Sequence, residues 1–192
     1  MIAVGRRKER LEELVHKHGH EKVQAVPLDI TKLESIPAFA TNITGTHPDL
    51  DCIVLNSGLQ RKCDWSDLES VDIDTIQTEM LTNYTAQLAL TKAFLPFLKE
   101  RKDASSLIYI SSGLSMVPML GTSNYCATKA ALHQWVLCLR ESLRSTKIKV
   151  VEVYPPAVQT ELHDVNPDIR DGRSFGMPLN EFIDEVRLVH SF

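Results

Sequence analysis

The stretch Cys52-Ile53-Val54-Leu55-Asn56-Ser57-Gly58 decides the class of fold. Its four consecutive apolar residues are typical of a strand buried on both faces of a sheet, and Asn-Ser-Gly predicts where that strand ends. The same pattern recurs at Leu107-Ile108-Tyr109-Ile110, which Ser111-Ser112 follows, and at residues 148–154, which Pro155-Pro156 follows. Three such strands predict a parallel sheet that helices cover.

Helical patterns separate these strands. Apolar residues at helical spacing predict helices at 7–18, 31–46 (interrupted at Pro37), 72–99, 124–145 and 179–189. Shorter strand candidates lie at residues 2–4 and 23–28, and residues 161–178 are rich in Asp, Pro and Gly and predict a mobile loop. The alternation predicts one α/β domain over residues 1–192 with a doubly wound, Rossmann-like parallel sheet.

Composition excludes several classes of protein. The 192 residues carry 21 basic and 25 acidic side chains, a net charge of −4, and 43% of them are hydrophobic. The charge argues against a nucleic-acid partner, and the apolar fraction argues against a disordered chain. No apolar run reaches the roughly 18 residues of a membrane span. The chain becomes charged at Arg6, so we expect no secretory signal peptide.

The four cysteines predict reduced thiols in a cytoplasmic protein. No two of them form a C-x-x-C pair, so neither a zinc site nor a redox motif is indicated, and we expect no metal. They are Cys52, Cys63, Cys126 and Cys138.

Polar residues follow the predicted strands at the sheet edge where such folds bind ligands. Tyr125 and Lys129 stand four residues apart and share one helix face, so the ammonium should lower the pKa of the phenol from about 10. That would make Tyr125 a proton donor or acceptor near neutral pH. Ser112 could hydrogen-bond a substrate oxygen beside it. Each signal alone also fits an exposed helix pair or a turn serine.

Taken together, the segments resemble the short-chain dehydrogenases/reductases, with similar spacing from residue 2 to about 162. The segments that carry the resemblance are Asp29-Ile30-Thr31, Leu55-Asn56-Ser57-Gly58, Asn83, Ser112, Tyr125-x-x-x-Lys129 and Tyr154-Pro155-Pro156-Ala157-Val158-Gln159-Thr160. The resemblance implies hydride transfer between a nicotinamide and the carbon of a small-molecule carbonyl or alcohol.

The resemblance also implies a role for each catalytic residue. Tyr125 is the general acid/base, and Lys129 lowers its pKa and holds the nicotinamide ribose. Ser112 orients the substrate carbonyl. Asn83 supports a water that links Lys129 to solvent as a proton relay.

Cofactor-binding residues follow from the same resemblance. Asn56, Ser57 and Gly58 pass near the adenosine ribose, Asp29 and Ile30 hold the adenine, and Pro155, Val158 and Thr160 position the nicotinamide amide. Arg6 and Arg7 follow the first strand candidate, where an arginine suits a 2′-phosphate. This favours NADP(H) over NAD(H), although the same arginines also fit an ordinary basic helix start.

The sequence departs from the family at both ends. No G-x-x-x-G-x-G or G-x-G-x-x-G occurs, so we expect the family's first strand, its phosphate-binding glycine turn and its first helix to lie upstream of Met1. That strand is central in the family's sheet, so its loss would expose the edges of two strands. The resemblance implies a last strand beyond the helix at 179–189, which we do not expect within these 192 residues, and Pro156 replaces a usual glycine. We expect a fragment truncated at both ends.

Two functions therefore remain open. One is an NADP(H)-dependent oxidoreductase, and the other is a catalytically weak or silent fragment that acts through protein association. Helices 72–99 and 123–145 would form a homo-oligomer interface, and we expect turnover by these residues alone to be weak or absent. An epimerase shares Tyr-x-x-x-Lys, but residues 155–160 favour simple oxidoreduction, and Ser112 lacks the G-x-S-x-G turn of a hydrolase.

The substrate is not defined by the sequence. An apolar wall is expected between Ser112 and Tyr125, from Met116, Val117, Met119 and Leu120. The loop 161–178 offers His163, Phe175 and Met177 as further candidates for the substrate pocket.

Overall fold

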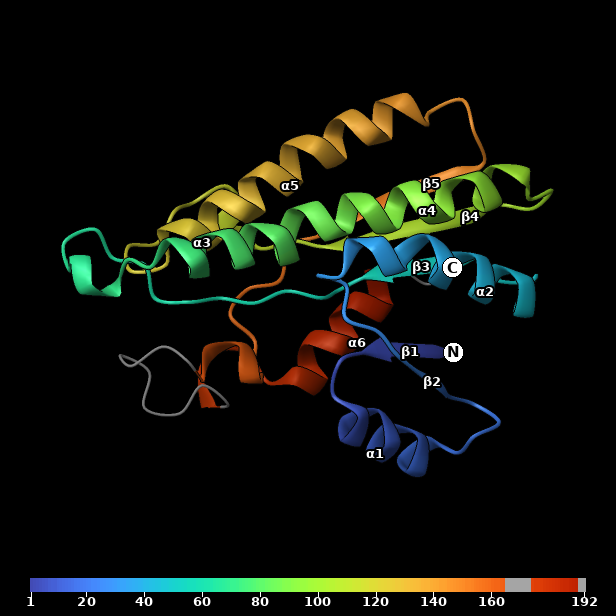
Figure 1. The fold of residues 1–192 in the computed structure, drawn as a ribbon, viewed down its shortest axis with the longest axis horizontal. Coiled ribbons are helices and arrows are strands. Elements are labelled where there is room, and N and C mark those ends of the chain that lie inside the picture. The colour runs from blue at the N-terminus through green and yellow to red at the C-terminus, as the bar shows by residue number, and fades with distance from the viewer. Residues whose placement is uncertain (165–173, 190–192) are drawn as a thin grey trace.

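The computed structural model describes residues 1–164 and 174–189, with side chains to Val186 (Figure 1). The strands in these residues are β1 (Ile2–Gly5), β2 (Gln24–Pro27), β3 (Cys52–Leu55), β4 (Ser105–Ile110) and β5 (Ile148–Val153). The α-helices are α1 (Lys8–His18), α2 (Ile36–Thr46), α3 (Ile73–Met80), α4 (Ala86–Glu100), α5 (Ser123–Ser142) and α6 (Leu179–Val189). The predicted alternation of strands and helices is confirmed.

The described strands form two parallel sheets. In one sheet β1 pairs with β2, with Val4 opposite Val26. In the other the order is β3-β4-β5, with Val54 opposite Ile108. Within the described residues no strand pairs with both β1 and β3, so both strands present an open edge, as the sequence predicted. Val54 on β3 is accordingly 56% exposed.

Two apolar clusters hold the layers together. The larger one lies between the β3-β4-β5 sheet and helices α4 and α5, and its centre is Tyr109. The Tyr109 ring packs edge-on against Trp135 at 5.6 Å, and its hydroxyl hydrogen-bonds Thr91 at 2.7 Å. The second cluster centres on Phe94 and draws in Ile2 and Ile53, one from each sheet. Figure 1 shows α4 and α5 on one side of the strands and α1 on the other.

Two helices differ from the sequence prediction. The helix predicted from residue 31 begins at Ile36, and Pro37 lies in its first turn, where a missing N–H costs nothing, instead of interrupting the helix. The helical run predicted at 72–99 is continuous, but a π turn, η3 (Leu81–Thr85), separates α3 from α4. The short 3-10 turns are η1 (Leu33–Ser35), η2 (Leu68–Ser70), η4 (Gly113–Ser115) and η5 (Glu161–His163).

The C-terminal part of the chain is only partly described. Of the predicted loop 161–178, residues 165–173 lie outside the described residues, and the remainder contains η5 and an isolated bridge between Val158 and Met177. Helix α6 has the predicted bounds, 179–189. Among the described helices, none has the length and apolar character needed to span a bilayer.

Candidate active site

A cavity of about 1020 Å³ opens beyond the carboxyl ends of β3, β4 and β5. Its wall contains many of the predicted site residues, which come from four separate segments of the chain: Asn56, Gly58, Ser112, Tyr125, Lys129, Pro155, Val158 and Thr160. Ligands in parallel sheets bind at this edge. The structure therefore brings the predicted catalytic and nicotinamide-side residues to one place, apart from Asn83, which lies beneath the wall.

Helix α5 supplies Tyr125 and Lys129 from its first two turns. Both side chains are buried, at 5% and 4% exposure. The Lys129 ammonium lies 5.6 Å from the centre of the Tyr125 ring, and its Nζ donates a hydrogen bond to the Ile110 carbonyl at 2.8 Å. The spacing of the two residues in the sequence thus correctly placed both groups on one wall of the cavity.

The electrostatics of this pair differ from the prediction. Burial raises the pKa of Tyr125 to about 12; a hydrogen bond with Ser112 opposes that rise, and the charges of Glu79 and Cys126 add to it. Burial also lowers the pKa of Lys129 to about 8, against the opposing effect of Glu152. The prediction that Lys129 lowers the pKa of Tyr125 is wrong here because desolvation dominates and the ammonium points to a backbone carbonyl.

Ser112 is the second residue after β4 and lines the cavity together with Tyr125. Its Oγ accepts a hydrogen bond from the Leu114 amide at 3.1 Å and so begins the turn η4. Its neighbour Ser111 also lines the cavity, and the buried Ser111 Oγ has no hydrogen-bond partner in the described residues. A buried hydroxyl without a partner is costly, so this position suits a polar ligand group.

Asn83 lies in the π turn η3 and is fully buried. Its side-chain amide accepts from the Leu59 N–H and donates to the Leu59 carbonyl, both at 2.8 Å, and it also donates to Thr128 Oγ1 at 3.0 Å. Asn83 therefore clamps the segment after β3 onto α5. A Cβ at Gly58 would lie 3.4 Å from Asn83 Oδ1, so the backbone at Gly58 lies close to the Asn83 side chain.

A buried carboxylate, Glu79, was not predicted from the sequence. It is 1% exposed, and it accepts hydrogen bonds from the Arg61 amide at 3.0 Å and from the side chain of Asn124. Because Asn124 precedes Tyr125, Glu79 fixes the first turn of α5. Burial raises the pKa of Glu79. Glutamate on a helix is ordinarily solvated, so the sequence held no signal for this role.

A second cluster missed by the sequence analysis lies behind Lys129. Glu152 Oε2 accepts from the Tyr154 hydroxyl at 2.7 Å and lies 3.0 Å from His133 Nδ1. The other Glu152 oxygen is buried and has no hydrogen-bond partner in the described residues. Burial and Glu152 together raise the pKa of Tyr154 to about 12. The cluster ties α5 to the end of β5, just before Pro155.

The predicted adenosine-side residues are divided, and Gly58 lines only the large cavity. Ile30, Asn56 and Ser57 line a second cavity of about 210 Å³ with residues of β1, β3 and α4. Asn56 is common to both cavities. Arg6 and Asp29 line neither; Asp29 instead accepts hydrogen bonds from the Thr31 amide and hydroxyl, which lower its pKa.

The rest of the large cavity is mostly apolar. Val117, Met119 and Leu120 line it as predicted, whereas Met116 does not. His163 and Phe175 line it too, in edge contact at 5.3 Å, and Met177 instead donates its amide to the Ala157 carbonyl. Lining residues that the sequence analysis did not select include Gln60, Lys62, Leu162, Leu179 and Phe182.

Metal and disulfide chemistry find no support in the described residues. No group of three or more His, Cys, Asp or Glu side chains is arranged there to hold a metal ion. All four cysteines, each of which is described, are free thiols.

Comparison with known proteins agrees with the fold and shows the family. Residues 1–169 match the short chain dehydrogenase family, and the chain belongs to this family of oxidoreductases. It is 30% identical over 184 residues to the uncharacterized oxidoreductase DltE of Bacillus subtilis, covering 95% of this chain and 71% of that protein. It is also 30% identical over 164 residues to the NADP-dependent 3-hydroxy acid dehydrogenase of Schizosaccharomyces pombe, covering 84% of this chain and 62% of that protein.

Solved structures show the same fold. The closed form of a serine dehydrogenase complexed with NADP⁺ superimposes with a TM-score of 0.86 at 27% identity, covering all of this chain and 79% of that one. The serine dehydrogenase of Escherichia coli gives a TM-score of 0.82 at 25% identity, with the same two coverages. The chain thus spans about two thirds to four fifths of the length of these proteins.

Proposed function

We propose that this chain carries out NADP(H)-dependent interconversion of a carbonyl and an alcohol, with Tyr125 as the general acid/base. The observation that carries the proposal is the buried Tyr125 phenol at a cavity that Ser112 and Lys129 also line. A proton donor, a second hydroxyl and a cation at one apolar cavity suit the oxygen of a carbonyl substrate.

The residues present fit a nicotinamide nucleotide. Lys129 is 4% exposed, lines the cavity and gives one hydrogen bond, to the Ile110 carbonyl, which leaves two N–H donors for the hydroxyls of a ribose. Pro155, Val158 and Thr160 form the wall that would hold the nicotinamide amide. When bound, the nicotinamide supplies or accepts the hydride.

The chain's own groups would handle the oxygen and its proton. The pKa of Tyr125, about 12, keeps the phenol protonated at neutral pH, so it is ready to donate when a carbonyl is reduced. Ser112 would hold the same oxygen and fix the carbonyl's orientation. Asn83 would support the path by which Lys129 exchanges protons with solvent, from its position between Leu59 and Thr128.

A preference for NADP(H) over NAD(H) is part of the proposal. Arg6 and Arg7 follow β1, and guanidinium groups match phosphate geometry. The preference is supported by the relative named as NADP-dependent and by the structural neighbour complexed with NADP⁺. Asp29 and Ile30 would hold the adenine, and Asn56, Ser57 and Gly58 the adenosine ribose.

We also propose a cytoplasmic homo-oligomer. The segments 72–99 and 123–145 would form its interface, since α5 carries an exposed apolar residue, Leu137, at 39% exposure. The free thiols are consistent with a reducing compartment.

The test is turnover of aldehydes and ketones with NADPH, compared between the wild type and Tyr125→Phe. Removing the phenolic proton donor should lower kcat by about 10²- to 10⁴-fold and leave NADPH affinity nearly unchanged. Turnover that is equal in both proteins would contradict the role of Tyr125. Measurable turnover by the wild type that Tyr125→Phe abolishes would show that our expectation of weak or absent activity is wrong.

A second candidate function rests on the open edges of β1 and β3 and on the lack of a glycine-rich turn in the sequence. Without that turn the pyrophosphate loses its usual cradle. The chain would then be a catalytically weak or silent member of the fold that acts through protein association. A folded chain that binds no NADPH and still self-associates would favour this candidate.

A further inference from the structure

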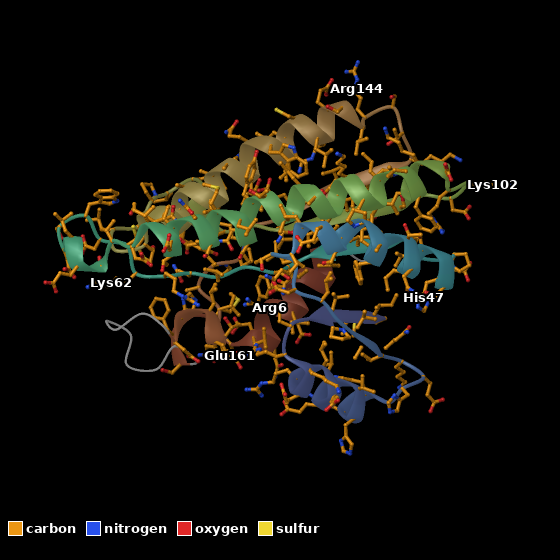
Figure 2. The ribbon with its side chains drawn as sticks, in the orientation of Figure 1. Arg6, His47, Lys62, Lys102, Arg144 and Glu161 are labelled. Atoms are coloured by element: carbon orange, nitrogen blue, oxygen red, sulfur yellow. The ribbon has the colours of Figure 1, made fainter. Side chains whose placement is uncertain are left out.

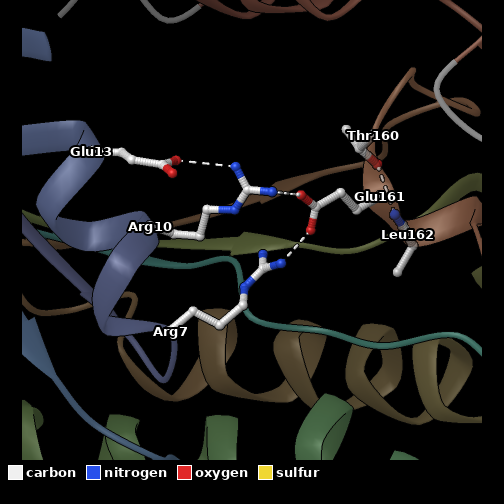
Figure 3. A network of polar contacts seen from close by, with 6 residues as sticks. All are labelled: Arg7, Arg10, Glu13, Thr160, Glu161 and Leu162. Atoms are coloured by element: carbon white, nitrogen blue, oxygen red, sulfur yellow. Dashed lines mark hydrogen bonds and ion pairs between the residues drawn. The ribbon is translucent and has the colours of Figure 1, made fainter.

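Two arginines at the start of α1 hold a carboxylate from a distant part of the chain (Figure 3). Arg7 Nη1 lies 2.5 Å from Glu161 Oε2, and Arg10 Nη2 lies 3.2 Å from Glu161 Oε1. Each oxygen of Glu161 therefore faces a different guanidinium. The other side of Arg10 pairs with Glu13 of the same helix at 3.0 Å.

These ion pairs connect the two halves of the molecule. Arg7 and Arg10 belong to the unit formed by β1, α1 and β2, whereas Glu161 begins η5, after β5 of the other sheet. Figure 2 shows Glu161 on the side of the molecule where Arg6 follows β1. Thr160, the residue before Glu161, lines the large cavity. The contact thus links the proposed 2′-phosphate side of the cofactor to the cavity wall.

We propose that Glu161 is an internal anion that occupies the subsite of Arg7 and Arg10, next to Arg6, where the proposed function already places the 2′-phosphate of NADP(H). The 2′-phosphate of NADP(H) displaces Glu161 from this subsite and so releases η5. The inference rests on the proposed function, because it takes the chain to use a nicotinamide nucleotide. NAD(H), which has a hydroxyl at this position, leaves Glu161 in place.

Chemistry favours the exchange. A guanidinium presents the same donor fork to carboxylate and to phosphate, and a phosphate monoester carries more negative charge and more acceptor oxygens than a carboxylate. The side chains of Arg7, Arg10 and Glu161 are 64%, 51% and 37% exposed. Ion pairs this exposed are weak, so a dianion can replace Glu161.

The displacement has a structural consequence at the cavity. The turn η5 is held by Thr160, whose Oγ1 accepts from the Leu162 amide at 3.3 Å, and by the hydrogen bond from the Asp164 amide to the Glu161 carbonyl at 3.2 Å. Leu162 and His163 from this turn line the cavity. Phosphate binding at α1 would therefore free part of the substrate wall.

The test compares Glu161→Gln with a matched control, Glu13→Gln. Both remove one carboxylate from Arg10, but only Glu161 bridges the two arginines. Dissociation constants for NADPH, NADH and adenosine 2′-monophosphate are measured by calorimetry on the whole chain. We expect Glu161→Gln to bind NADPH and adenosine 2′-monophosphate about three- to tenfold more tightly, with NADH unchanged, because the competing anion is gone. Glu13→Gln should change each by less than about twofold.

A second readout follows the turn itself. Hydrogen exchange at the Leu162 and Asp164 amides should accelerate when NADPH is added to the wild type, and should already be fast in Glu161→Gln without ligand. Added NADH should leave the wild-type exchange rates unchanged. Exchange rates that do not respond to NADPH would overturn the release of η5.

Failure of this inference can be told apart from failure of the proposed function. Unchanged or equally shifted affinities for NADPH and NADH in Glu161→Gln would overturn the subsite. A wild type that binds neither dinucleotide would refute the proposed function. In that case the affinity for adenosine 2′-monophosphate tests the subsite by itself. Tighter binding to Glu161→Gln than to the wild type would support the subsite. Equal binding to both proteins, or no binding to either, would overturn it.

Discussion

The chemistry of the site depends on two buried side chains one helical turn apart, Tyr125 and Lys129. Each is less than 6% exposed, and burial moves the pKa of each toward its neutral form, to about 12 for Tyr125 and about 8 for Lys129. Burial raises the pKa of an acid and lowers that of a base, so desolvation outweighs their proximity here. The Tyr125 phenol is therefore protonated at neutral pH, and the Lys129 ammonium loses its proton slightly above neutral pH.

The depressed pKa of Lys129 predicts a pH-dependent stability. The folded protein releases this proton near pH 8, whereas the unfolded chain keeps it up to about 10.5, so the unfolded state binds more protons between those values. The free energy of unfolding of the wild type, relative to Lys129→Met, should therefore rise from pH 8 to 10.5, by on the order of 3 kcal/mol. Urea denaturation across this range measures it. A difference that is flat with pH would contradict the burial of a titrating Lys129.

At the scale of residues, the sequence predicted what regular spacing controls. Tyr125 and Lys129 share a helix face because they stand four residues apart in the sequence. Ser112 follows β4, a strand that its run of apolar residues predicted. Glu79 and Glu152 could not be predicted, because a buried carboxylate depends on partners from other elements, here Asn124, His133 and Tyr154. Whether the selected residues act as assigned stays a prediction.

Among the elements, the segment after β5 is held in place by the chain just before α6. The Met177 amide donates to the Ala157 carbonyl at 2.8 Å, and the Gln159 amide donates to the Met177 carbonyl at 2.9 Å. Gly176 permits this approach. Its φ is +93°, and a Cβ there would lie 2.2 Å from the Ala157 carbonyl oxygen. The proposed nicotinamide wall therefore depends on a glycine nineteen residues further along the chain.

Gly176→Ala should separate these two segments, because both the backbone angle and the clash oppose a side chain. We expect a loss of about 2 kcal/mol or more in the free energy of unfolding and at least about tenfold weaker NADPH binding. Gly45→Ala is the control, since a Cβ there meets nothing within 4 Å and Gly45 lines neither cavity. Equal effects of the two substitutions on stability and binding would refute the clamp.

Element boundaries were predicted where a local signal fixes them. The helix predicted at 7–18 ends at His18, where Gly19 follows with φ +87°, and α6 has the predicted bounds. The start of α2 was misplaced because Pro37 fits a first helical turn as well as a break. The π turn at Leu81–Thr85 has no sequence signature, since it arises where Asn83 is drawn to Leu59 and Thr128.

For the molecule as a whole, the sequence predicted a parallel α/β fold with two open strand edges. The structure has those edges at β1 and β3, and Ile2 and Ile53 from the two sheets both pack against the cluster of Ala40, Ile43 and Phe94. The ion pairs of Arg7 and Arg10 with Glu161 add a second link between the halves. That link could not be foreseen, because it joins side chains more than 150 residues apart.

An open, apolar strand edge predicts self-association in solution. Val54→Lys should lower the amount of large aggregate at high protein concentration, because a charge on an edge strand opposes further pairing. Light scattering against concentration measures this. Val54 is 56% exposed, so the free energy of unfolding should change by less than about 1 kcal/mol.

Leu137→Lys on α5 serves as the comparison, since it tests association through the helices instead. Aggregation that persists in Val54→Lys and disappears in Leu137→Lys would assign association to the helices and contradict the role of the strand edge.

The central claim is that the cavity beyond β3, β4 and β5 belongs to an NADP(H) site, and a titration of NADPH into the folded chain tests it most directly. Cooperative unfolding is established first, and Lys129→Met provides the control. We predict saturable binding with a dissociation constant below about 100 μM, or about −5.5 kcal/mol, and at least about tenfold weaker binding to the variant. A cooperatively folded chain that shows no saturation up to about 1 mM NADPH would contradict the claim.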